Sequence, residues 1–196
     1  MTREESQASA AWRPGIGGYS VDILPWIDAI APTRPKPLAL VEIGVLYGRS
    51  ILYWAERLRQ LGHGADTRLV GVDMPVLDPD GHAVLKRNLE ETRSAWEPVT
   101  VELDLRPSVE AAASYADGSF DIAFIDGSHK EADVRADIEA WRRKVRAGGI
   151  LAGHDYGWRS GDHAGVKIAV DALLGPVEHR DSVWWQIVTR EPIARP

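Results

Sequence analysis

The residues of this sequence best suited to chemistry stand in two short polar clusters. Asp126 and His129 belong to Asp-Gly-Ser-His, His154 and Asp155 belong to Gly-His-Asp-Tyr, and each cluster follows a short apolar run. Carboxylate oxygens suit Mg²⁺ or Mn²⁺, and an imidazole shifts the preference toward Mn²⁺. Asp126, His154 and Asp155 are therefore candidate ligands of one divalent cation, which would lower the pKa of a bound hydroxyl group.

Without a metal, the same clusters predict acid–base chemistry. His154 would take the proton of a substrate hydroxyl as a general base, with Asp126 and His129 as further catalytic candidates. Each of these residues also has a structural alternative. Asp126 caps the helix that follows it, His154 donates to a backbone carbonyl, and His129 caps a surface turn.

A second candidate site is the turn within residues 38–50, which reads as a buried strand, a glycine-bearing turn and a helix. Proteins of the α/β class bind nucleotides at such turns. Gly44 and Gly48 do not have the G-x-G-x-x-G spacing of dinucleotide dehydrogenases, so the turn is not suited to pyrophosphate. Glu42 would accept from an ammonium or hydroxyl group, and Ser50 offers a hydroxyl beside the helix N-terminus. A plain strand-to-helix turn is the structural alternative.

Asp73 follows the second apolar run of the chain. Its distance from the first glycine turn is close to the ~20 residues at which an acid binds a ribose in nucleotide-binding folds. We expect Asp73 to accept from a diol. Its structural alternative is an ordinary turn residue, because Met74 and Pro75 come next.

Apolar periodicity indicates the elements that must position these residues. Strand-like and helix-like segments alternate, which predicts an α/β fold with a parallel sheet covered by helices on both faces. The final two strands are close enough to form a hairpin, which departs from an all-parallel sheet. The expected strands are residues 38–43, 68–72, 99–103, 121–125, 149–152, 177–179 and 183–189, and the expected helices are 49–61, 81–94, 108–115, 130–145 and 165–174.

One domain accounts for most of the chain's 196 residues. Residues 1–37 are expected to be an N-terminal leader with a short helix at 19–31, and residues 38–196 a single domain. The N-terminus has acids where a signal peptide has a basic region, and no apolar run reaches the ~20 residues of a membrane span. A cytoplasmic location without membrane association is therefore expected.

Composition excludes several function classes. With 0 Cys the chain has neither a thiolate nucleophile nor a cysteine-based zinc site. A net charge of −6 argues against nucleic acid as a partner, because neutralising phosphates requires clustered Lys and Arg.

Taken together, three blocks of the sequence resemble the class I S-adenosylmethionine-dependent methyltransferases, specifically the small-molecule O-methyltransferase group. The similarity extends over roughly residues 38–190. The blocks are Val-Glu-Ile-Gly-Val-Leu-Tyr-Gly-Arg-Ser at 41–50, Phe-Ile-Asp-Gly-Ser-His at 124–129 with the helix after it, and Gly-Gly-Ile-Leu-Ala-Gly-His-Asp-Tyr at 148–156 with Gly165 to Asp171.

This resemblance implies a Rossmann-like, doubly wound, seven-stranded sheet whose last strand is antiparallel. It implies S-adenosyl-L-methionine as cofactor, Mg²⁺ or Mn²⁺ at Asp126, His154 and Asp155, and a sugar, polyketide or phenolic small molecule as methyl acceptor. The chain is short for the group, so a homo-oligomer would complete the pocket. The cofactor-binding residues that the resemblance implies are Glu42, Gly44, Gly48, Ser50, Asp73, Ser108 and Asp126.

Two other functions stay open at this point. A cofactor-binding protein without turnover would share the glycine turn, although the acids and histidines at two strand ends speak against it. A nicotinamide-dependent oxidoreductase is disfavoured by the missing G-x-G-x-x-G. A serine hydrolase lacks its G-x-S-x-G turn in this sequence.

Overall fold

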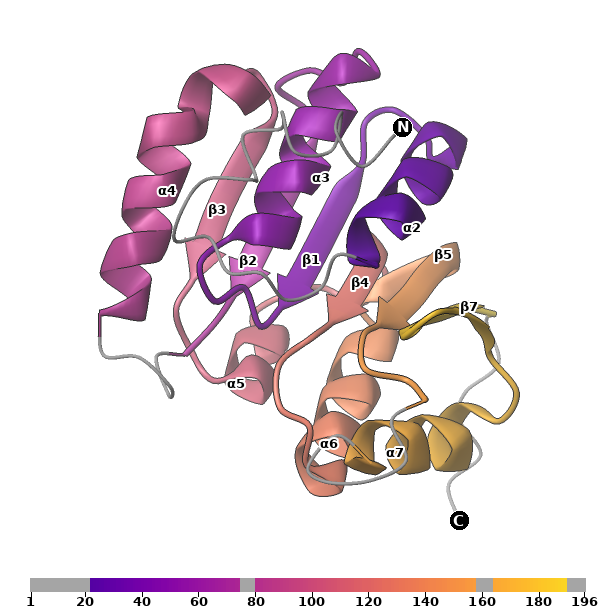
Figure 1. Ribbon diagram of the computed structural model, residues 1–196. Coiled ribbons are helices and arrows are strands. Elements are labelled where there is room, and N and C mark those ends of the chain that lie inside the picture. Colours follow the sequence, from indigo (N-terminus) through magenta and orange to yellow (C-terminus); the bar gives the residue numbers. More distant parts are fainter. Residues whose placement is uncertain (1–21, 75–79, 158–163, 190–196) are drawn as a thin grey trace.

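The computed structural model describes residues 22–74, 80–157 and 164–189, and within them the chain forms one seven-stranded sheet (Figure 1). The strand order is β3-β2-β1-β4-β5-β7-β6. β7 pairs antiparallel with β5 and β6, and the other pairs are parallel, which confirms the predicted fold. The strands are β1 (Ala39–Ile43), β2 (Arg68–Val72), β3 (Thr100–Asp104), β4 (Phe120–Ile125), β5 (Val145–Gly153), β6 (Glu178–Arg180) and β7 (Val183–Ile187).

Helices cover both faces of the sheet because its central strands are apolar on both sides. All of β4 is buried, as expected for a strand between two helical layers. One face carries α2 (Ile23–Ile30), the short 3₁₀ helix η2 (Ala31–Thr33), α3 (Arg49–Gln60) and α4 (Gly81–Trp96). The other face carries α5 (Ser108–Ala113), α6 (Glu131–Arg142) and α7 (Ala164–Leu174) (Figure 1).

The predicted helix at 130–145 ends three residues too late. α6 stops at Arg142, and Val145 already pairs with Phe120 as the first residue of β5. The intervening Lys144 is buried, and its Nζ donates to the Tyr115 carbonyl at 2.8 Å and pairs with Asp117 at 2.6 Å. This tertiary contact of a charged side chain ends the helix, and no periodicity in the sequence encodes it.

The short helix before the sheet is part of the core. Trp26 of α2 is buried, with its ring 5.8 Å from that of Trp54, 5.3 Å from Phe124 and 6.2 Å from Trp185. Such aromatic contacts fix α2 on the sheet face that also holds α3. Among the described residues, none of the helices is both long and apolar enough to cross a bilayer.

A substitution at Gly44 tests the packing between the ends of β1 and β4. Gly44 has φ +85°, and an added Cβ would lie 2.2 Å from the Asp126 carbonyl oxygen and 2.6 Å from the Gly127 Cα. We expect Gly44→Ala to lower the free energy of unfolding by at least about 2 kcal/mol more than Gly175→Ala, measured by urea titration. Gly175 has φ +68° with open space around it, so that variant carries only the backbone cost of about 1 kcal/mol. Equal losses would contradict the packing argument.

Candidate functional site

The carboxyl ends of β1, β4 and β5 lie level with one another. Ile43 is opposite Ile125, and Ile125 is opposite Gly153. The ladder continues one residue further, because the Asp126 amide donates to the Ile43 carbonyl at 2.7 Å and the His154 amide to the Ile125 carbonyl at 3.0 Å. Asp126 and His154 are therefore neighbours at the same edge of the sheet.

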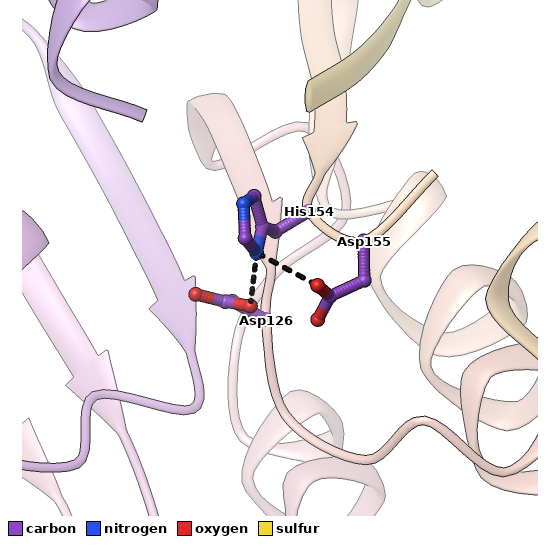
Figure 2. Close-up of side chains that lie close together, drawn as sticks. All are labelled: Asp126, His154 and Asp155. Atoms are coloured by element: carbon purple, nitrogen blue, oxygen red, sulfur yellow. Dashed lines mark ion pairs between the residues drawn. The ribbon is translucent and has the colours of Figure 1, made fainter. Parts of the chain in front are cut away.

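At this edge the structure brings together Asp126, His154 and Asp155. The His154 Nδ1 lies 3.4 Å from Asp126 Oδ1 and 3.3 Å from Asp155 Oδ1. Figure 2 shows the imidazole directed between the two carboxylates. One potential ligand atom of each residue lies within 4.8 Å of the other two, a spacing compatible with one shared cation.

His154 has further partners on its other ring nitrogen. Its Nε2 lies 3.1 Å and 3.2 Å from the two carboxylate oxygens of Asp22 and 2.8 Å from the Ser182 Oγ. Burial lowers the pKa of His154, but hydrogen bonds to Asp126, Asp155 and Asp22 outweigh it and raise the pKa to about 12. Neither Asp22 nor Ser182 was among the residues predicted for the site, because neither follows a central strand.

His129 joins the cluster through Asp155. Its Nε2 lies 2.8 Å from Asp155 Oδ2, and this hydrogen bond raises the pKa of His129. Burial opposes ionisation of Asp155, yet hydrogen bonds from His129 and His154 hold its pKa well below the usual range. Asp155 also has φ +61°, a strained conformation that aspartate tolerates better than most residues. His129 and His154 therefore both form hydrogen bonds with the ionised carboxylate of Asp155.

A small cavity of about 10 Å³, no larger than one water molecule, lies beside these residues. Polar groups of Asp126, His129, His154 and Asp155 form one part of its wall, and Val134, Val166 and Trp184 form another. The valines belong to α6 and α7, so the cavity lies on the side of the sheet covered by those helices. Its lining thus places apolar side chains directly beside the polar cluster.

Glu42 is fully buried on the opposite side of the sheet, where α3 begins. Ser50 in the first turn of α3 donates to its Oε1, while Oε2 has no hydrogen-bond partner among the described residues. Burial is the main cause that raises the pKa of Glu42 to about 8, and the nearby Asp126 and Asp73 carboxylates add to it. A buried polar atom without a partner is costly, so this carboxyl oxygen calls for a polar partner beyond the described residues.

Asp73 holds the glycine turn in place. Its Oδ2 accepts from the amides of Val45 and Leu46 at 2.9 Å and 2.5 Å, and its Oδ1 accepts from the Met74 amide at 2.6 Å. A carboxylate offers about four acceptor positions, so binding a ribose diol there stays a prediction. Gly48 ends the turn with φ +93° and precedes the first residue of α3.

Ser108, the remaining candidate, is engaged with α6. Its Oγ accepts from Trp141 Nε1 at 2.8 Å, and a hydrogen bond also links it to Asp137. Asp104, on β3, is paired with Arg106 and accepts from the Tyr115 hydroxyl at 3.0 Å. Cofactor binding by Ser108 stays a prediction, and its visible role is to join α5 to α6.

The donor set at the strand ends fits a divalent cation. Two carboxylates and an imidazole are ligands that Mn²⁺ accepts, and the carboxylates suit Mg²⁺. Ligating histidines usually donate their other ring N–H to a carboxylate, which is where Asp22 stands. The residues present could therefore hold such an ion, with Nδ1 of His154 deprotonated.

Comparison with known proteins supports a transferase. The sequence model of a family described as a methyltransferase domain matches residues 41–156, which include the glycine turn and both polar clusters. No curated protein sequence matches the chain.

Solved structures resemble the chain in fold. A putative O-methyltransferase from Klebsiella pneumoniae is 17% identical with a TM-score of 0.67, covering 95% of this chain and 89% of that one. CalS11, a TDP-rhamnose 3′-O-methyltransferase of calicheamicin biosynthesis, is 19% identical with a TM-score of 0.63, covering 87% and 80%. The SAH-bound methyltransferase PaMTH1 from Podospora anserina is 17% identical with a TM-score of 0.62, covering 83% and 76%.

The raised pKa of Glu42 predicts a pH-dependent stability. Between about pH 4.5 and 8 the unfolded chain loses the Glu42 proton while the folded chain keeps it. The free energy of unfolding of the wild type should therefore fall relative to Glu42→Gln as pH rises through this window. We expect a relative loss of at least about 1 kcal/mol in urea titrations between pH 5 and 8. The variant of the exposed Glu139, Glu139→Gln, should follow the wild type, and parallel curves for all three proteins would contradict the burial argument.

Proposed function

The chain belongs to the methyltransferase family whose model spans residues 41–156, and from this we propose that it transfers a methyl group from S-adenosylmethionine to a hydroxyl oxygen of a small molecule. The observation that carries the proposal is the arrangement at the ends of β1, β4 and β5. A buried acceptor at Glu42 stands on one side, and Asp126, His154, Asp155 and a cavity stand on the other.

Glu42 is proposed to bind the amino-acid end of the cofactor. Its Oε2 lacks a partner among the described residues, and an ammonium group would supply both a donor and a positive charge beside these acids. Ser50 keeps the carboxyl group in place from the first turn of α3. Asp73, which fixes the turn, is proposed to accept from the ribose with its remaining acceptor positions.

S-adenosylmethionine, when bound, would supply a sulfonium methyl group: the acceptor oxygen would bond to the methyl carbon as the C–S bond breaks, S-adenosylhomocysteine would leave, and the O–H proton would pass to a base. The chain must align the acceptor oxygen and remove that proton. Asp126, His154 and Asp155 would hold Mg²⁺ or Mn²⁺, which lowers the pKa of a hydroxyl bound to it.

The Asp155–His129 pair is proposed to receive the proton. His129 lies at the cavity wall with about a third of its side chain exposed, and Asp155 orients its ring through Nε2. A histidine held by a carboxylate is a common arrangement for a general base. His154 is surrounded by three carboxylates and is better suited to holding a charge or a metal than to taking a proton from the substrate.

The acceptor is proposed to be a sugar, polyketide or phenolic hydroxyl. Apolar side chains of α6 and α7 lie beside the polar cluster, and a ring packed on them would present one hydroxyl to the carboxylates. CalS11 is named as acting on TDP-rhamnose, and another protein of similar fold is named as a putative caffeoyl-CoA O-methyltransferase. Nucleotide-linked deoxysugars and phenols are therefore the first acceptors to assay.

Cofactor binding should release a proton at pH 7. Glu42 is protonated in the free protein because its pKa is about 8, and an ammonium beside it would favour the ionised form. We expect S-adenosylhomocysteine to bind in calorimetry with an enthalpy that depends on the ionisation enthalpy of the buffer. Glu42→Gln should abolish that dependence and weaken binding about tenfold, whereas Glu139→Gln should do neither.

The calorimetry distinguishes a failure of the proposed function from a failure of the proposed contact between Glu42 and the ammonium group. Absence of heat and of a thermal shift with both S-adenosylmethionine and S-adenosylhomocysteine would end the proposed function. Binding with equal proton release in wild type and Glu42→Gln would leave methyl transfer in place and remove the contact between Glu42 and the ammonium.

Turnover tests the reaction site. With S-adenosylmethionine labelled in its methyl group and the acceptors above, we expect chelator to lower product formation at least about tenfold and Mg²⁺ or Mn²⁺ to restore it. Asp155→Asn should lose turnover and keep its affinity for S-adenosylhomocysteine. Asp117→Asn, which removes an exposed carboxylate paired with Lys144, should keep both. Full activity in chelator would overturn the metal, and cofactor binding without any product would favour a non-catalytic role.

A further inference from the structure

Both ring nitrogens of His154 have hydrogen-bond partners. The partners of Nε2 include Asp22, an acid that precedes the first strand. Nδ1 faces Asp126 and Asp155, whereas Nε2 faces Asp22 and Ser182. Asp22 precedes α2, and Ser182 lies in the turn between β6 and β7. Two segments that are distant in sequence from Asp126 and His154 therefore converge on one side chain of the site.

Asp22 does not act as a helix cap, although its position invites that role. An aspartate before a helix commonly accepts from the free amides of the first turn. Here the Asp22 side chain makes no such bond, and it accepts instead from the Ser182 amide at 3.3 Å and from the Ser182 hydroxyl. Its two oxygens also lie 3.1 Å and 3.2 Å from His154 Nε2, so the carboxylate is directed at His154.

The helix that carries Asp22 is rigidly placed. Ile23, Leu24, Trp26 and Ile27 are buried against the sheet, and the Trp26 ring contacts aromatic rings from α3, β4 and β7. An acid at the start of such a helix has a defined position relative to the strand ends. A residue can fix the orientation of a metal-ligating histidine ring through a second hydrogen bond only if its own position is fixed in this way.

We propose that Asp22 is a positioning residue of the site: it holds the Nε2 edge of His154, so that Nδ1 is directed between Asp126 and Asp155. This inference rests on the proposed function for its consequence, because a fixed Nδ1 is what a cation or an acceptor hydroxyl at these carboxylates would meet. Ser182 assists by orienting the Asp22 carboxylate. Residue 22, in the segment expected to form a short helix ahead of the domain, thereby becomes part of the proposed reaction site.

The positioning role of Asp22 has a physical basis in the rotation of the His154 imidazole ring. Rotation about the bond to the ring is broad and roughly two-fold, so contacts at one edge alone leave two orientations open. Donation from Nε2 to Asp22 selects one of them. A simple structural link between α2 and the β6–β7 turn is the competing explanation, and it requires nothing of His154.

Nuclear magnetic resonance of the histidine rings distinguishes the two explanations without any ligand. In full-length protein labelled with ¹⁵N-histidine, His154 is assigned by substituting the other histidines one at a time. We expect a slowly exchanging Nε2 proton in the wild type and exchange at least about tenfold faster in Asp22→Ala. Asp22→Asn should retain most of the protection, because its Oδ1 still accepts from Nε2–H.

Asp28→Ala is the matched control. Asp28 lies on the same helix, its side chain has the same 22% exposure as that of Asp22, and it also accepts hydrogen bonds, from Tyr53 at 3.0 Å. It should change the His154 proton exchange by no more than about twofold. An unchanged His154 signal in Asp22→Ala, or an equal change in Asp28→Ala, would overturn the positioning role.

Metal and cofactor titrations separate this inference from the proposed function. Mn²⁺ binding followed by electron paramagnetic resonance should weaken at least about tenfold in Asp22→Ala and stay unchanged in Asp28→Ala. Affinity for S-adenosylhomocysteine should stay within about twofold in both variants. A wild type that binds no Mn²⁺ would count against the metal, and the ring spectra would still decide the role of Asp22.

Discussion

The first and fourth strands must end side by side with no side chain between them, and the site depends on this contact. Gly44 lies so close to the backbone of Asp126 and Gly127 that any larger residue would collide with it. This contact marks the point where the strand order reverses, since β1 continues to β2 and β3 on one side and β4 to β5 on the other. Ligands of open α/β sheets bind at such reversals.

The reversal also divides the polar residues between the two faces. Glu42 and Ser50 lie on the side of α3, and the cavity beside Asp126 and Asp155 lies on the side of α6 and α7. In the proposed reaction the methyl group would cross the sheet edge at this point, from a cofactor held near Glu42 to an acceptor held near Asp126. A short path between two binding regions is what in-line displacement requires.

The sequence predicted those features that follow from period and register. Strands with apolar residues on both sides must be central, and their carboxyl ends must meet, so the proximity of Asp126, His154 and Asp155 could be expected. The end of α6 and the contacts of Asp22 could not, because Lys144 and His154 find their partners through tertiary packing. Asp22 directly precedes α2, where an aspartate commonly caps a helix, but its side chain makes no cap hydrogen bond there.

Charge gives the last constraint on what the site can bind. Glu42, Asp73, Asp126 and Asp155 lie near one another, and the pKa of both Glu42 and Asp126 is raised, first by burial and then by neighbouring carboxylates. His154 compensates only part of this negative charge, while Asp22 on its far edge adds to it. A cluster of acids favours a positively charged ligand. The proposed cofactor meets this condition through its sulfonium and ammonium groups, and a divalent cation meets it through its own charge. Electrostatics and geometry thus favour the same occupants at this sheet edge.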